Sequence, residues 1–132
     1  MGAHPYQYLV DYQADVQAAL DKLREDVFRR GEFYGAGRGA KTPAEALEMC
    51  GETGTRSILD IMTVQEKPDF CCAAPLTPGE LERYFGTCQP SAKAMESSDD
   101  FWNDLERGMA RYLVVYENAK PIKLFFAGYS FD

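Results

Sequence analysis

The sequence is poor in the residues that most often carry out catalysis or bind metals. His4 is the only histidine among 132 residues, so Ser-His-Asp and Cys-His catalytic arrangements are nearly excluded. The four cysteines form no C-x-x-C pair, and one histidine beside them makes no evident zinc site. We therefore expect neither a metal nor another cofactor. We expect the cysteines to be buried thiols of a protein in a reducing compartment.

Basic residues and long apolar runs are also scarce. The chain has 14 Lys and Arg against 21 Asp and Glu, which gives a formal net charge of −7. This charge disfavours binding to nucleic acid or to anionic lipid, and it favours a partner with a basic surface. No apolar run is long enough to span a bilayer, and "MGAHPYQYLV" lacks the basic segment of a signal peptide. We therefore expect a cytoplasmic protein that does not enter a membrane.

Apolar and aromatic residues are plentiful. Hydrophobic residues make up 45% of the chain and aromatic residues 13%, so a chain of this length can bury a substantial core. We expect one domain over residues 1–132. The periodicity of the apolar residues predicts strands at 6–12, 56–64, 70–76, 110–116 and 122–131, and helices at 15–30, 43–50, 78–85 and 99–107.

Several helix ends carry recognisable signals. "TPAE" and "TPGE" place Thr42 and Thr77 at N-cap positions with a glutamate three residues later, which is the pattern of a capping box. Ser97 or Ser98 is expected to cap the fourth helix, and Gly108 to end it. These signals define the boundaries of the helices more sharply than periodicity alone.

The resulting order of elements is βααββααββ. Strands that follow one another in pairs without a helix between them favour an antiparallel arrangement. Segments 56–64 and 70–76 are expected to form an antiparallel hairpin or to be neighbouring strands, and segments 6–12 and 110–116 to be central or near-central strands. The sequence thus predicts an α+β fold, with an antiparallel sheet of about five strands and helices packed mainly on one face.

The stretch "GAGRGAKT", residues 35–42, partly matches a phosphate-binding loop. Ala40 stands where the second glycine belongs, and a charged helix rather than a buried strand precedes the segment. Thr42 is already assigned to a helix cap. We therefore interpret the segment as a glycine-rich loop without a nucleotide. Arg38 and Lys41, placed just before a helix N-terminus, remain a secondary contact site for an anionic group.

A cluster of polar residues in "CGETGTRSILD" offers one alternative as an enzyme or ligand-binding site. Glu52 or Asp60 could act as a general acid or base, with Arg56 as an electrostatic clamp. The competing interpretation is structural: Arg56 pairs with a nearby carboxylate and holds the turn in place.

The segment of the fourth helix combines acidic residues with an aromatic pair. Asp99, Asp100, Asp104 and Glu106 surround Trp102, which follows Phe101 directly. Acidic residues on a helix often form only a solvated face. An aromatic side chain within a charged rim, however, is typical of a protein-binding surface. We select these four acids and Trp102 as the candidate partner-binding residues.

Two short motifs, "GTRSILDI" and "FFAGYSFD", give the chain a resemblance to small, uncharacterised bacterial single-domain proteins. We expect the aromatic tail to be buried against the rest of the domain. In size, acidity, mixed fold and lack of a catalytic signature, the chain is also similar to immunity proteins. Those proteins neutralise secreted toxin domains by covering or distorting their active sites.

The resemblance implies a non-enzymatic domain that binds a protein, as an immunity protein or an antitoxin-like inhibitor of a basic toxin or effector. Two alternatives stay open. One is a small enzyme or ligand-binding domain around Glu52, Arg56 and Asp60. The other is a structural subunit of a homo-oligomer.

Overall fold

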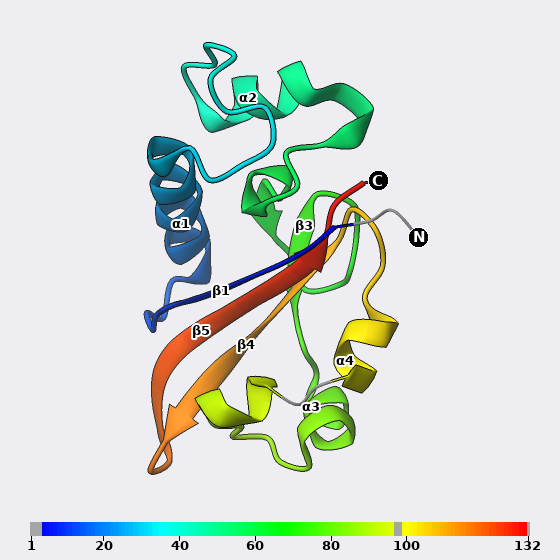
Figure 1. Ribbon diagram of the computed structural model, residues 1–132. Coiled ribbons are helices and arrows are strands. Elements are labelled where there is room, and N and C mark those ends of the chain that lie inside the picture. The colour runs from blue at the N-terminus through cyan, green and yellow to red at the C-terminus, as the bar shows by residue number, and fades with distance from the viewer. Residues whose placement is uncertain (1–3, 97–98, 132) are drawn as a thin grey trace.

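The computed structural model describes residues 4–96 and 99–131, apart from the side chain of Glu52. These residues form an α+β fold on a five-stranded sheet, with the strands side by side in the order β1–β5–β4–β3–β2 (Figure 1). The strands are β1 (Pro5–Asp11), β2 (Thr63–Val64), β3 (Cys72–Pro75), β4 (Ala110–Glu117) and β5 (Lys120–Tyr129). Strands β1 and β2 are therefore the two edges of the sheet.

Helices of two kinds connect the strands. Over the described residues, the α-helices are α1 (Val16–Arg30), α2 (Pro43–Cys50), α3 (Pro78–Phe85) and α4 (Asp99–Asp104). The 3-10 helices are η1 (Gly51–Thr53), η2 (Ile58–Asp60) and η3 (Ala92–Glu96). The observed order of elements differs from the predicted βααββααββ because these short helices lie between the predicted elements.

The predicted N-caps Thr42 and Thr77 are confirmed, because each side chain accepts a bond from the amide three residues later. The side chain of Asp15 accepts a hydrogen bond from the amide of Ala18 and so caps α1. Helix α1 then ends at Gly31, whose φ of 69° is in the left-handed region. Before α3, Thr77 and Glu80 form a complete capping box.

The sheet is mixed, so the prediction of an antiparallel sheet is wrong. Strand β5 pairs antiparallel with both β1 and β4, but β3 pairs parallel with β4 and with β2. The segment with α3, η3 and α4 connects β3 to β4 as a crossover, and parallel strands need such a connection. The expectation that the first strand is central or near-central is also wrong, because β1 is an edge strand.

Helices cover both faces of the sheet, which corrects the prediction that they pack mainly on one face. Leu124 and Phe126 of β5 pack in the core under α1 and α2. Phe125 and Ala127 alternate with them and pack in a second core under α3, η3 and α4. Figure 1 shows the two groups of helices on opposite sides of the sheet. Burial of both faces of β5 confirms that the aromatic tail packs against its own chain.

The prediction of a strand over residues 56–64 is wrong for most of its length. Arg56 has a φ of 56°, and Ser57 then caps the 3-10 helix η2 by accepting a bond from the amide of Leu59. Only Thr63 and Val64 pair as a strand. Ser57 offers the backbone a local bond that competes with sheet pairing.

Helix α4 is shorter than predicted. It ends at Asp104, whereas Gly108 was expected to end it. Gly108 instead lies where the chain passes close to Phe70 and Phe131, and a Cβ at this position would come within 2.7 Å of Phe70 Cδ1. The predicted caps Ser97 and Ser98 lie outside the described residues. In the described part of the chain, no helix is both long and apolar enough to cross a bilayer.

Candidate functional site

Phe101 anchors α4 and thereby presents Trp102 at the surface. The Phe101 side chain is buried, and its ring centroid lies 5.8 Å from that of Tyr84 and 6.4 Å from that of Phe125. Trp102, the next residue, is only half-buried and meets Tyr129 edge to face at 5.7 Å. Trp102 thus packs against the second core beside Phe101 and remains partly exposed.

Trp102 lines a surface hollow between α4 and the first strand. The hollow has a volume of about 440 Å³ and is formed by Pro5, Tyr6, Gln7, Trp102 and Tyr129. We call it the aromatic hollow. A hollow lined by three aromatic residues offers apolar area to an inserted side chain, which is the usual setting of an energetic hot spot in a protein interface.

The acidic residues of the α4 segment differ in whether their charge is already paired within the chain. Asp99, Asp100 and Glu106 are exposed. Asp104 forms an ion pair with Arg83 and accepts a bond from the hydroxyl of Tyr84 at 2.7 Å. Its charge is therefore partly balanced within the chain, and we expect Asp104 to attract a basic partner less strongly than the other three acids do.

The secondary contact site lies on the loop between α1 and α2. Arg38 stacks on the ring of Tyr34 at 5.3 Å, and Arg56 lies 4.3 Å from the same ring centroid. Lys41 is exposed just before Thr42, the N-cap of α2. The two predicted cations thus share one exposed loop, and Tyr34 connects that loop to the turn that contains Arg56.

Asp60, the proposed acid or base of the enzymatic alternative, lies in the interior. Its side chain is 0% exposed. Oδ1 of Asp60 accepts bonds from the backbone amide of Thr55 at 2.6 Å and from the hydroxyl of Thr55 at 2.8 Å. The same hydroxyl lies 2.8 Å from that of Ser57. This network joins the two ends of the turn before η2, so Asp60 stabilises the turn.

The environment of Asp60 opposes its ionisation. Burial raises the pKa of the carboxyl above its usual range, although bonds from Thr55 and from the backbone of Arg56 act in the opposite direction. Oδ2 has no hydrogen-bond partner among the described residues. Because the group is fully buried, a substrate could reach it only after a rearrangement of the turn. The side chain of Glu52 lies outside the described residues, so the structure brings together only Arg56 and Asp60 of the three.

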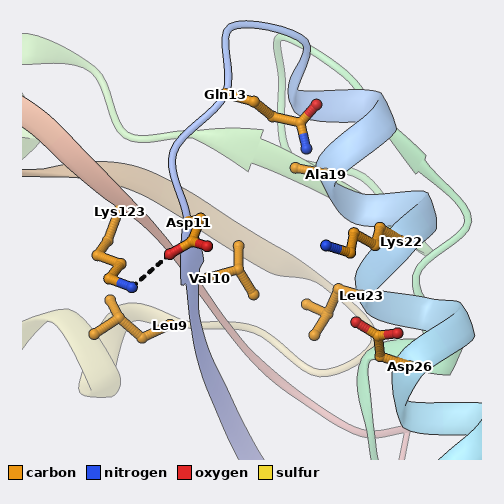
Figure 2. Close-up of a pocket in the computed structure, with 9 residues that line it drawn as sticks. All are labelled: Leu9, Val10, Asp11, Gln13, Ala19, Lys22, Leu23, Asp26 and Lys123. Carbon is orange, nitrogen blue, oxygen red and sulfur yellow. Dashed lines mark hydrogen bonds and ion pairs between the residues drawn. The ribbon is translucent and has the colours of Figure 1, made fainter.

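A further groove, which the sequence did not predict, runs between β1 and α1. It has a volume of about 240 Å³, and Figure 2 shows side chains from both elements that converge on it. Its charged residues are Asp11, Lys22, Asp26 and Lys123, and the ammonium group of Lys123 lies 2.6 Å from Oδ1 of Asp11. The alternation in residues 6–12 places Leu9 and Asp11 on one face of the strand, but it does not reveal that β1 is an edge.

The comparisons with known proteins give no relative. No protein-family model, no curated protein and no solved structure matches the chain. Among the described residues, no group of three or more His, Cys, Asp and Glu side chains could hold a metal ion. The candidate sites therefore depend on their geometry alone.

Proposed function

We propose that this chain is a non-enzymatic protein-binding domain whose contact surface is the aromatic hollow together with the exposed acids of the α4 region. The observation that carries the proposal is the half-buried Trp102, held edge to face against Tyr129 in the aromatic hollow. Asp99, Asp100 and Glu106 are exposed residues of the same segment of the chain. Aromatic anchors surrounded by charged rims are typical of protein interfaces.

The kind of partner follows from charge. The net charge of −7 and the exposed acids of the α4 segment favour a partner with a basic surface. In this function the acids accelerate the encounter, and Trp102 supplies the desolvated contact. An immunity protein or an antitoxin-like inhibitor that covers a basic toxin or effector fits this description. Of the four free cysteines, Cys50 and Cys72 are buried as expected, whereas Cys71 is only partly buried and Cys88 is exposed, so the expectation of buried thiols is wrong for these two.

The test begins with capture of the partner from cells that produce the protein, followed by affinity measurements with the purified pair. Trp102→Ala should weaken binding by about 2 kcal/mol, the range of an interface hot spot. The double variant Asp99→Asn/Asp100→Asn should slow association and reduce its dependence on salt. The matched control is Glu25→Gln/Glu48→Gln, which makes the same charge change at exposed positions of α1 and α2.

The result can reject the proposal. If the Trp102 variant binds like the parent, the aromatic hollow is not the contact surface. If the α4 and control double variants lose the same amount of affinity, net charge alone is responsible, and the local acids have no special role.

A further inference from the structure

Among the described residues, no strand pairs with the outer edge of β1. The amide of Tyr12 donates to the carbonyl of Ile122 at 3.1 Å, and the amide of Ser130 donates to the carbonyl of His4 at 3.0 Å. In an antiparallel pair, residues bonded to the neighbour alternate with residues whose amide and carbonyl point away. Even-numbered residues of β1 therefore bond to β5, and Gln7, Leu9 and Asp11 direct their backbone groups outward.

This edge carries few of the devices that usually block strand addition, namely Pro5 at its start and the charged Asp11 at its end. Natural edge strands are shortened, bulged, or interrupted by lysine or proline. Strand β1 has seven residues in an unbroken register with β5. It contains no lysine, and its only proline is Pro5 at its start. The opposite edge, β2, has only two residues.

Exposed apolar side chains accompany the unpaired edge. Leu9 is 47% exposed and Tyr12, directly after the strand, is 39% exposed. These two belong to the small set of large hydrophobic side chains exposed on the described surface. The edge therefore offers both backbone bonds and apolar area to another strand.

The charges of the groove beside this edge distinguish between possible occupants. Lys22 and Asp26 lie one helical turn apart on the side of α1 that faces β1, and Lys123 and Asp11 form an ion pair across β5 and β1 (Figure 2). The groove is thus lined by two cations and two anions. A basic strand from a partner would be repelled by Lys22 and Lys123. A second copy of the groove carries both cations and anions, so it can place charges of opposite sign against those of the first.

We propose that two copies of this chain associate through their β1 edges, so that their sheets join into one across a two-fold axis near Leu9. In this antiparallel pairing, Leu9 of one copy lies opposite Leu9 of the other, and Gln7 lies opposite Asp11. In such a dimer Lys22 of one α1 can pair with Asp26 of the other, in competition with the ion pair between Asp26 and Arg29 within each copy. Isologous contacts of this kind require a self-complementary surface, which the groove provides.

Analytical ultracentrifugation of the full chain, from micromolar to near-millimolar concentration, tests the proposal. The parent should reach a dimer as the concentration rises. Leu9→Pro removes the outward amide without breaking a β1–β5 bond, and proline is tolerated in an edge strand when its nitrogen faces outward. This variant should remain monomeric. Leu9→Val keeps the amide and is the matched control, so it should dimerise like the parent.

A charge exchange on the exposed face of α1 gives a second test that leaves the sheet unchanged. Lys22→Glu places like charges opposite each other in the dimer and should raise the dimer Kd by about tenfold, equivalent to about 1.4 kcal/mol. Lys22→Glu/Asp26→Lys restores opposite charges and should return the Kd to within about threefold of the parent value. Thermal melting of each variant checks that it is folded.

Three outcomes would contradict the dimer. The parent chain could be monomeric at every concentration, or a folded Leu9→Pro variant could still dimerise. The double variant Lys22→Glu/Asp26→Lys could also fail to recover the Kd of the parent. If Leu9→Pro instead abolishes binding to a different protein, the edge receives a foreign strand and not a second copy. Trp102→Ala should leave the dimer intact, which separates this proposal from the proposed contact at α4.

Discussion

The backbone amide and the hydroxyl of Thr55 both donate to the same carboxylate oxygen of Asp60, at 2.6 Å and 2.8 Å. Two bonds to one oxygen define the path of the chain between η1 and η2, although the carboxyl group lies in a fully buried position. The arrangement assigns Asp60 a structural role, and it makes the stability of the fold sensitive to the protonation of this group.

Asp60→Asn should change how stability depends on pH. Because burial raises the pKa of Asp60 from its usual 3.8, the native state holds the proton more tightly than the unfolded state does. The contribution of Asp60 is therefore most favourable below the unfolded pKa and declines as pH rises through the raised pKa. Urea unfolding between about pH 4 and about pH 8 should show that the Asn variant becomes more stable relative to the parent as the pH rises. The gain should be about 1.4 kcal/mol for each unit by which folding raises the pKa of Asp60. A constant difference would contradict the assignment.

Glu80→Gln should give the opposite pH dependence. Arg111 donates to both oxygens of Glu80, at 2.6 Å and 3.1 Å, and holds the pKa of that carboxyl below its usual 4.5. The stabilisation is present above pH 4.5 and is lost as pH falls through the lowered pKa. The variant should lose about 1–2 kcal/mol of unfolding free energy at neutral pH. Glu82→Gln, an exposed control on α3, should change it by no more than about 0.5 kcal/mol.

Gly54→Ala should destabilise the chain more than Gly51→Ala does. Both glycines have positive φ values, 70° and 60°, so both substitutions introduce backbone strain. A Cβ at Gly54 would also lie 2.6 Å from Phe131 Cδ2 and 2.8 Å from Asp60 Oδ2, whereas nothing lies within 4 Å at Gly51. Denaturant unfolding should show an additional loss of about 1–3 kcal/mol at Gly54. Equal losses would mean that the turn relaxes around the added methyl group.

Ala119→Gly should stabilise the β4–β5 hairpin. Asn118 and Ala119 have φ values of 53° and 65°, and a turn with two positive values favours Asn-Gly. Glycine removes the steric penalty at the second position, which is about 1 kcal/mol for an alanine. Ala18→Gly is the control in α1, where the same change should instead lower stability by about 1 kcal/mol. The two melting temperatures should therefore move in opposite directions.

Tyr129→Ala should change the fluorescence of Trp102, which is the only tryptophan of the chain. Loss of the edge-to-face ring opens one wall of the aromatic hollow and exposes the indole to water. Emission should shift to longer wavelength, and quenching by acrylamide should increase. Tyr116→Ala removes a similarly half-buried ring from β4 that does not line the hollow, and it should leave both quantities unchanged.

Most of the helices and the final hairpin could be predicted from the sequence because their determinants are local. Thr42 caps α2, and Thr77 with Glu80 begins α3, through contacts between residues only three positions apart. The choice of the acids and Trp102 of the α4 segment as partner-binding residues stays a prediction. The sequence did not predict that the charge of Asp104 is partly balanced within the chain, since its ion pair with Arg83 joins residues that are distant in the sequence.

The prediction was wrong where distant segments decide the outcome. Residues 56–64 have the composition of a strand, yet Arg56 with positive φ and the cap at Ser57 convert most of the segment into a turn and a 3-10 helix. That turn is stable because Asp60 accepts a hydrogen bond from Thr55 beneath the core that α1 and α2 help to form. Strand propensity says that a residue packs well within a sheet. It does not say whether a neighbouring strand is present for the segment to pair with.

By itself, the sequence determined the α+β composition, the principal helices with their caps, and the acidic segment around Trp102. Only the tertiary structure decided that the sheet is mixed, that helices cover both of its faces, and that β1 is an open edge beside a charged groove. The physical reason is the range of the interactions. Caps and periodicity act within a few residues, whereas strand neighbours and the burial of Asp60 depend on contacts between residues far apart in the chain.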